Sequence, residues 1–288
     1  MPRPAEPPVE SPSSLSDAYR LLTGGLLRPI AGGTDVMVQI TGEIGDPPRR
    51  VLDLWRLDEL RGISLDGEVL VLGALTTYTD IRQSPLVGEF LPELGEAAAT
   101  IGAAQIQNRG TLGGNIANAS PAGDTLPLLL ATDAQVVVGS ARGERTIAAH
   151  DFWTGYRRTA MAPDELVVRV RIPLANDRQV RFRKVGTRRA QAISKVVMAL
   201  AWRAAPDGTW AAVRLALGSV AERPIRAWET EQILEGVQPS EQTADRAVAS
   251  LAAEIHPIDD VRSTSAYRLA VATRVLHRLI REGGAERP

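Results

Sequence analysis

The N-terminal half of the chain alternates short apolar runs with breaks rich in glycine and proline. A short helix is predicted at residues 16–22, with Ser16 as its N-cap and Gly24 and Gly25 beyond its end. Short strands are predicted at 27–30, 50–54, 69–72, 134–138 and 166–172, the last half-buried because Val and Arg alternate in it. Helices are predicted at 92–104 and 126–131. Residues 36–40 fit a helix or an extended segment, and 108–115 contain too much glycine for regular structure.

The character of the chain changes at 173–178, where Pro, Asn and Asp cluster, and a domain boundary is predicted near residue 175. Strands at 196–202 and 210–217 flank an Asp-Gly turn, which predicts a hairpin with Trp202 and Trp210 facing each other or the core. Helices follow at 228–234 and 240–254. Ser265 can cap the last helix, which Gly283 and Gly284 end, and its apolar stripe consists of Tyr267, Val271, Val275, Leu276, Leu279 and Ile280.

The composition narrows the chemistry that this chain can perform. Its 288 residues, 44% hydrophobic, can bury the cores of two domains, and a net charge of −1 provides no broad basic field for nucleic acid. Without cysteine the chain cannot form a disulfide, a Cys-ligated zinc site or an Fe–S cluster. Three widely separated histidines argue against a His-based metal site, and no metal is expected. Redox chemistry would therefore need an organic cofactor.

The sequence also predicts where the protein resides. No stretch approaches the ~20 apolar residues of a membrane span. Residues 1–14 are rich in Pro, Glu and Ser and lack the features of a signal peptide, so we expect a disordered lead-in. The expected location is the cytoplasm.

Two glycine-rich segments carry the candidate chemistry, Ala-Gly-Gly-Thr-Asp at 31–35 and Thr-Leu-Gly-Gly-Asn at 111–115. Adjacent glycines permit positive φ and bring backbone N–H groups close to a ligand, so such loops can hold a pyrophosphate. A tight turn at 120–124 adds the carboxylate of Asp124. Neither segment matches a Rossmann or P-loop motif. Together they indicate a long phosphorylated ligand.

Simpler interpretations of these residues stay open. A glycine pair after a strand is often a plain turn, and Asp124 could also cap the helix at 126–131. The segment 178–195 is rich in arginine and has no acid. It could be a solvated strand face, a subunit contact or a guide for an anionic nicotinamide cofactor.

Longer motifs surround these segments: AGGTD at 31–35, RGTLGGNIANASPAGD at 109–124 and KVGTRRAQAISKV at 184–196. Together with 151–173 and 263–276 they resemble the FAD-binding subunit of the xanthine dehydrogenase and carbon monoxide dehydrogenase family of molybdenum hydroxylases. The resemblance implies an α+β fold. Residues 15–175 would form a two-subdomain FAD-binding domain of the vanillyl-alcohol-oxidase (PCMH) type, and 176–288 a C-terminal domain with a three-stranded antiparallel sheet and helices.

The resemblance also implies the contacts to FAD. The first loop should hold the pyrophosphate through backbone N–H groups, and Thr111 and Asn115 should bond phosphate or ribityl oxygens. Asp124 should accept from a hydroxyl, and Lys184 should donate near the polar edge of the flavin. The full set of expected contacts is Pro29, Ile30, Ala31, Gly32, Gly33, Thr34, Asp35, Val36, Ile101, Thr111, Leu112, Gly113, Gly114, Asn115, Asp124, Val167 and Lys184.

One position departs from the family pattern. In the carbon monoxide branch a Tyr follows the paired arginines and covers the flavin ring, whereas Ala190 follows Arg188 and Arg189 here. The apolar candidate for this role is Ile193.

The implied function is electron transfer without a catalytic residue of the chain itself. Electrons would pass from 2Fe–2S clusters of a small partner subunit through FAD to NAD⁺ or another acceptor, and a large partner subunit would hold the molybdenum cofactor. The three subunits would form a heterotrimer able to dimerise. Two alternatives remain. A free-standing FAD-dependent oxidoreductase would need a His, Tyr or Glu above the flavin, and a nucleotide-binding or assembly module would hold no flavin.

Overall fold

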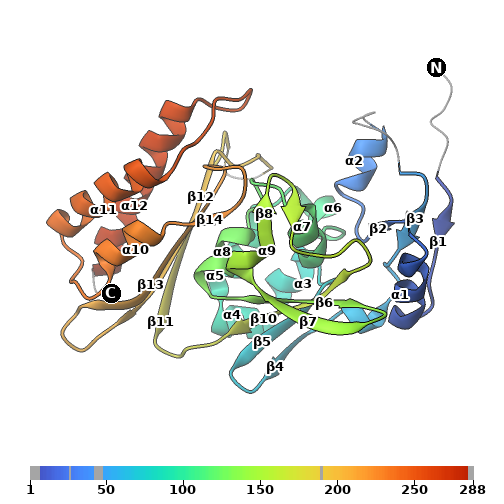
Figure 1. Ribbon diagram of the computed structural model, residues 1–288. Coiled ribbons are helices and arrows are strands. Elements are labelled where there is room, and N and C mark those ends of the chain that lie inside the picture. Colours follow the sequence, from blue (N-terminus) through green and yellow to red (C-terminus); the bar gives the residue numbers. More distant parts are fainter. Residues whose placement is uncertain (1–6, 26, 42–47, 189–190, 285–288) are drawn as a thin grey trace.

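The computed structural model describes residues 7–25, 27–41, 48–188 and 191–284. Three structural layers follow one another across the molecule, as Figure 1 shows from right to left. A small parallel sheet comes first, a five-stranded antiparallel sheet with helices lies in the centre, and a four-stranded sheet covered by three helices comes last. No helix in these ranges is long and apolar enough to cross a membrane.

The small parallel sheet has the order β1-β3-β2, formed by β1 (Val9–Glu10), β3 (Val51–Asp53) and β2 (Arg28–Ile30). Helix α1 (Leu15–Thr23) buries Ala18 and Leu22 in the same cluster as Leu52. Ser14, not Ser16, caps α1, since its hydroxyl accepts from the N–H of Asp17. Within the expected lead-in of residues 1–14, Val9 and Glu10 form β1 and pair with Val51 and Leu52 of β3. Residues 1–6 lie outside the described ranges.

The central sheet has the order β4-β5-β10-β6-β7 and its neighbouring strands are antiparallel. Its strands are β4 (Ile63–Asp66), β5 (Val69–Gly73), β10 (Leu166–Pro173), β6 (Gln135–Ser140) and β7 (Gly143–Ala148). Along β10, Val168 and Val170 are buried while Arg169 and Arg171 pair with surface carboxylates, as the half-buried pattern predicts.

Short helices surround this sheet, and most of them contribute to the largest core, whereas the first of them in the chain buries Leu60 in the cluster of the small parallel sheet. They are η1 (Asp58–Leu60), α3 (Tyr78–Gln83), α4 (Pro85–Phe90), α5 (Pro92–Ala99), α6 (Ala104–Gln107), α7 (Leu112–Asn118), α8 (Leu126–Ala131) and α9 (Ala149–Phe152). Two predictions fail here. The helix expected at 92–104 ends at Ala99, before Gly102 with its φ of +55°. The segment 108–115, expected to be irregular, enters α7 at Leu112, because the Thr111 hydroxyl caps that helix.

The last sheet has the order β11-β12-β13-β14, formed by β11 (Arg178–Val185), β12 (Val196–Ala204), β13 (Trp210–Gly218) and β14 (Ile225–Arg226). The three long strands match the expected three-stranded sheet, and the two-residue β14 extends its edge. Alternate residues of β12 enter different cores: Val197 and Ala199 join the central core, whereas Met198 and Leu200 pack with the C-terminal helices. Burial of both faces fixes this sheet between α8 on one side and those helices on the other (Figure 1).

The C-terminal helices are α10 (Trp228–Leu234), α11 (Glu241–Glu254) and α12 (Ser265–Gly284). Trp202 and Trp210 stack with ring centroids 4.5 Å apart, which confirms the hairpin prediction. Gly283 lies in the last turn of α12, which ends at Gly284, and a Cβ at Gly283 would be 2.8 Å from the Trp210 ring, so this position needs a glycine. The hydroxyl of Thr264, not of Ser265, accepts from the first turn of α12.

Candidate cofactor site

A cavity of about 510 Å³ lies where the small parallel sheet faces the central sheet. Its walls come from β2 and the loop to α2 (Val36–Thr41), from the starts of α3 and α7, and from the first residues of β10. Fourteen of the expected contact residues line it: Pro29, Ile30, Ala31, Gly32, Gly33, Thr34, Asp35, Val36, Ile101, Thr111, Gly113, Gly114, Asn115 and Val167. Leu112, Asp124 and Lys184 do not. Leu112 is buried in the core behind the wall.

The loop at 31–35 presents unused backbone donors to this cavity. The N–H groups of Gly32, Gly33, Thr34 and Asp35 donate to no acceptor among the described residues. Gly33 has a φ of +78°, a backbone conformation that favours glycine. Because backbone donors are rarely left unpaired unless solvent or a ligand accepts from them, this loop is suited to an anion such as a pyrophosphate.

Gly32 also allows the first glycine segment to pack closely against the chain at Arg109, a contact that the sequence does not predict. A Cβ at this position would lie 1.6 Å from the carbonyl oxygen of Arg109 and 3.0 Å from the nitrogen of Gly110. The first glycine segment therefore packs directly on the chain entering the second. Only a glycine permits this contact between the two walls.

The second segment differs from the first, because its backbone N–H groups already donate to acceptors within the chain. Leu112 N donates to Thr76 O at 2.9 Å and Gly113 N donates to Ala74 O at 2.9 Å. Gly114 N donates to the Thr111 hydroxyl at 3.1 Å. The segment thus forms a wall. The side-chain amide of Asn115 donates to no acceptor among the described residues, and its Oδ1 accepts from Thr125.

Asp124 and Lys184 form a buried ion pair behind the Ile101 end of the cavity. Lys184 Nζ lies 2.6 Å from Asp124 Oδ2 and donates to the carbonyl of Thr100, the neighbour of Ile101. Asp124 does not cap α8, so that alternative is wrong. Burial raises the pKa of Asp124 and the charge of Lys184 opposes the rise. Asp124 Oδ1 is buried without a hydrogen-bond partner among the described residues, although the Ser194 hydroxyl lies near enough to lower the pKa of Asp124.

The rim of the cavity is tied together by polar side chains. Asp35 Oδ1 accepts from Asn118 at 2.9 Å, and Asn118 Oδ1 accepts from Arg157 at 2.8 Å. Arg157 has a φ of +51° at the tip of the hairpin formed by β8 (Trp153–Gly155) and β9 (Arg158–Thr159). These contacts hold the donor loop against α7.

Three lining residues with charged or titratable side chains escaped the sequence analysis. Arg28 faces the cavity without an ion-pair partner among the described residues. Burial first, and then the negative charges of Asp124 and Asp35, raise the pKa of Tyr78, so its phenol stays protonated. The local sequence shows only that Tyr78 follows Thr77, the N-cap of α3, and gives no sign that Tyr78 lines a cavity.

Glu165, the third, is fully engaged by the protein. Its oxygens accept from Arg145 at 2.7 and 2.8 Å, and Oε2 accepts from the N–H of Ala162 at 2.7 Å. The hydrogen-bonded guanidinium lowers the pKa of Glu165. A carboxylate held this way cannot easily exchange a proton with a substrate.

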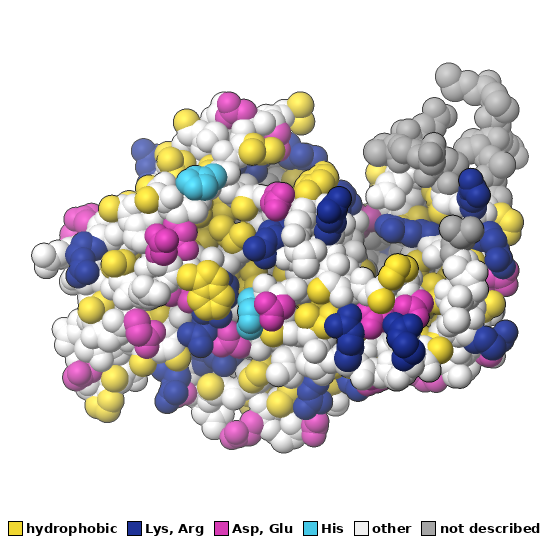
Figure 2. Space-filling model, viewed as in Figure 1, with side chains coloured by type: hydrophobic (Ala, Val, Ile, Leu, Met, Phe, Trp, Pro, Cys, Tyr) yellow, Lys and Arg dark blue, Asp and Glu magenta, His cyan; other side chains and the backbone are white. Residues whose placement is uncertain are grey.

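The basic segment at 178–195 lies along β11 and the loop after it, and its cations have local partners. Arg181 lies over the Trp202 ring, Arg183 pairs with Glu282, and Lys195 lies over Tyr267. On the face in Figure 2, basic and acidic side chains are interspersed rather than gathered by sign. Ile193 is 55% exposed and does not line the cavity. Residues 189–190 lie outside the described ranges.

The fold and the cavity are those expected of a flavin-binding protein. Comparison with known proteins identifies its family. A family model for the FAD binding domain in molybdopterin dehydrogenase matches residues 5–175, and one for the CO dehydrogenase flavoprotein C-terminal domain matches 181–283. The chain therefore belongs to the FAD-binding (medium) subunits of the molybdenum hydroxylase family. It binds FAD and forms part of an oxidoreductase.

Individual relatives resemble this chain over nearly its whole length. The glyceraldehyde dehydrogenase medium chain of Sulfolobus acidocaldarius is 32% identical over 90% of this chain and 91% of its own. The xanthine dehydrogenase FAD-binding subunit of Escherichia coli O157:H7 is 32% identical over 95% and 94%. The carbon monoxide dehydrogenase structure from Hydrogenophaga pseudoflava superposes with a TM-score of 0.91 at 30% identity, covering 96% of both chains. The expected fold is confirmed.

The residues present fit an FAD molecule. The open donors at 32–35 suit its pyrophosphate, and the unpartnered Asp124 Oδ1 suits a hydroxyl or ring N–H. Apolar side chains of Ile101, Ile106 and Val167 provide walls on which a ring can pack.

Proposed function

We propose that this chain is the electron-transfer subunit of a molybdenum hydroxylase, passing electrons from partner 2Fe–2S clusters through FAD to NAD⁺ or another acceptor. Bound FAD supplies the ability to exchange one or two electrons. The observation that carries the proposal is the cavity with open backbone donors in a chain that has no cysteine. Clusters that feed the flavin must then belong to another polypeptide.

The proposed FAD contacts are the fourteen expected residues that line the cavity, with Asp124 and Lys184 acting from behind its wall, whereas Leu112 supports that wall from the core. The loop at 31–35 binds the pyrophosphate through its N–H groups, and Asn115 donates to an oxygen of the same ligand. Lys184 pairs with Asp124 Oδ2 and orients this carboxyl group, which leaves Oδ1 for a donor of the cofactor. Arg28, at the cavity wall, adds positive charge toward the phosphates.

The proposed partners are a large subunit with the molybdenum cofactor and a small 2Fe–2S subunit. Several curated relatives are named medium chains or medium subunits, which supports assembly with a larger and a smaller chain. We also propose a division into two domains near residue 175, between β10 and β11. The separate family matches at 5–175 and 181–283 support it.

The cavity offers little support for a free-standing FAD oxidoreductase with its own substrate. Such an enzyme would need an acid or base near the flavin. The phenol of Tyr78 is held protonated by burial, and both oxygens of Glu165 are engaged by Arg145. Asp35, the other carboxylate of the lining, accepts from Asn118 at the rim.

Purification from the native host tests the proposal. Yellow protein absorbing at about 450 nm, accompanied by a large molybdenum subunit and a small Fe–S subunit, would support it. The complex is then reduced anaerobically with its substrate and mixed with NAD⁺, and return of the flavin band identifies NAD⁺ as an acceptor. A solitary yellow protein that is bleached by a simple alcohol or hydroxy acid would refute the proposal in favour of the free-standing oxidoreductase. A colourless protein that takes up no added FAD would refute both.

A further inference from the structure

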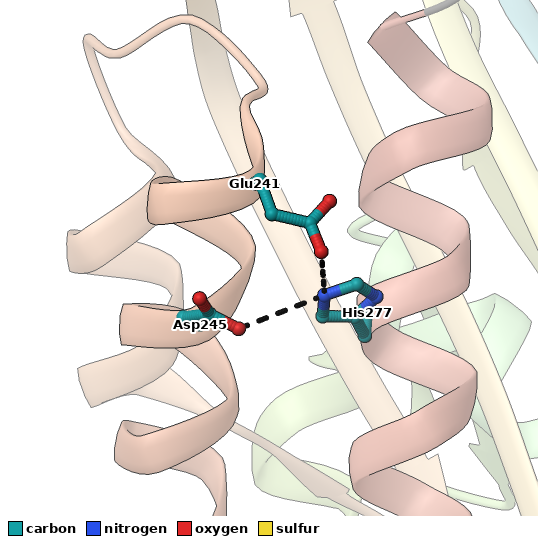
Figure 3. Close-up of side chains that lie close together, drawn as sticks. All are labelled: Glu241, Asp245 and His277. Atoms are coloured by element: carbon teal, nitrogen blue, oxygen red, sulfur yellow. Dashed lines mark ion pairs between the residues drawn. The ribbon is translucent and has the colours of Figure 1, made fainter.

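A cluster of potential metal ligands lies on the C-terminal helices, far in the fold from the cavity walls. Glu241 and Asp245 occupy successive turns of α11, and His277 projects from the adjacent turn of α12. Figure 3 shows the imidazole directed toward both carboxylates from the opposite helix. One ligand atom from each side chain lies within 4.8 Å of the other two.

The separations between these atoms match those around a small divalent ion. His277 Nε2 lies 3.2 Å from Glu241 Oε1 and 3.7 Å from Asp245 Oδ1. Ligands bound tetrahedrally at about 2.1 Å from a metal are about 3.4 Å apart. An ion could therefore enter with small side-chain movements.

The surrounding structure fixes the positions from which these ligands project. Ala244 and Ala247 of α11 and Leu276 of α12 are buried in one core, so the two helices cannot move apart freely. Arg281 Nε lies 3.3 Å from Glu241 Oε2, which orients the carboxylate and leaves Oε1 toward His277. The ligands themselves remain accessible: His277 is 27% exposed, Glu241 62% and Asp245 72%.

We propose that Glu241, Asp245 and His277 form a binding site for a divalent transition metal of the Zn²⁺ and Co²⁺ class, which links α11 to α12. An imidazole nitrogen favours these ions over Mg²⁺ and Ca²⁺, which prefer oxygen ligands alone. Two carboxylates balance the charge of the ion, and water completes its coordination. The site stabilises the C-terminal helices and does not depend on the proposed electron transfer.

Metal titration of the purified holoprotein, without an affinity tag and after treatment with a chelator, tests the site. Titration with Co²⁺ should give one equivalent per chain and a visible absorption band of tetrahedral or five-coordinate Co²⁺. At Zn²⁺ concentrations about 100-fold above Kd, the Tm should rise by about 5 °C. The H277A variant should bind at least tenfold more weakly and lose both effects.

His256→Ala is the matched control, because His256 is exposed in the loop between the same two helices and is not a member of the ligand group. H256A should bind Co²⁺ like the wild type. If H277A folds poorly in chelator, E241Q and D245N keep the shape of the site while removing a charged ligand, and each should weaken binding at least tenfold. The proposal is overturned if the wild type takes up no Co²⁺ or Zn²⁺ at micromolar concentrations, or if H277A, E241Q and D245N all bind as it does.

Discussion

The contact between Gly32 and Arg109 allows the cofactor site to be tested with one methyl group. Gly32→Ala places a Cβ 1.6 Å from the Arg109 carbonyl oxygen, where ordinary contact begins at 3.4 Å. The two backbones must therefore separate by about 1.8 Å, and backbone atoms, unlike the end of a side chain, cannot rotate away. Overpacking of this kind costs about 1–3 kcal/mol, and we expect the upper value.

The consequence for FAD follows from the position of the donor loop. A displacement of that size breaks hydrogen bonds of about 3 Å. Losing two of them to a charged phosphate, at about 1.5 kcal/mol each, weakens binding about 100-fold. A destabilisation of about 3 kcal/mol should lower the Tm by about 6–12 °C.

Both effects are measurable on the isolated chain. FAD affinity is obtained by titrating apoprotein and following the quenching of flavin fluorescence, and Tm by circular dichroism. Gly88→Ala is the matched control, since a Cβ at Gly88 in α4 would meet nothing within 4 Å, and this variant should behave like the wild type or be slightly more stable. A G32A protein with unchanged FAD affinity and unchanged Tm would refute the reasoning about this contact.

Three further perturbations address the charged groups. Lys184→Met leaves the buried carboxylate of Asp124 without its cation and should cost about 3–5 kcal/mol, seen as a large fall in Tm. Arg28→Gln should weaken FAD about fivefold at low salt, with a difference that shrinks as salt is added, in the same fluorescence titration. Glu165→Gln should lower the Tm at pH 7, and this difference should shrink as the pH falls below 4.5. The reason is that Arg145 lowers the pKa of Glu165, so the pair stabilises the fold above the ordinary value of 4.5 and this contribution is lost as the pH falls.

Each of these has a control or a contrary outcome. Asp124→Asn combined with Lys184→Met should recover stability, because no buried charge remains. A salt-independent effect of Arg28→Gln would contradict an electrostatic role for that residue. A loss of Tm in Glu165→Gln that is equal at pH 3 and pH 7 would point to packing rather than charge.

Elements with a strong local signal could be predicted from the sequence alone. The periodicity of 265–280 fixes α12, and the Asp-Gly turn between two apolar runs fixes the hairpin with its stacked Trp202 and Trp210. Composition also needs no knowledge of the fold, and the absence of cysteine by itself excludes an Fe–S cluster ligated by this chain. The motif at 31–35 predicted a candidate donor loop, although a glycine pair after a strand is often a plain turn.

The roles of individual donors and carboxylates could not be predicted, since the residues that bind to them are distant in sequence. In the sequence both glycine segments resemble donor loops, yet N–H groups of the second donate to the carbonyl oxygens of Ala74 and Thr76. Likewise, the nearest signal for Asp124 was a helix cap, whereas the packing of β11 brings Lys184 to it. A hydrogen-bond donor or a carboxylate takes the best partner available in space, and only the folded chain fixes which partner that is.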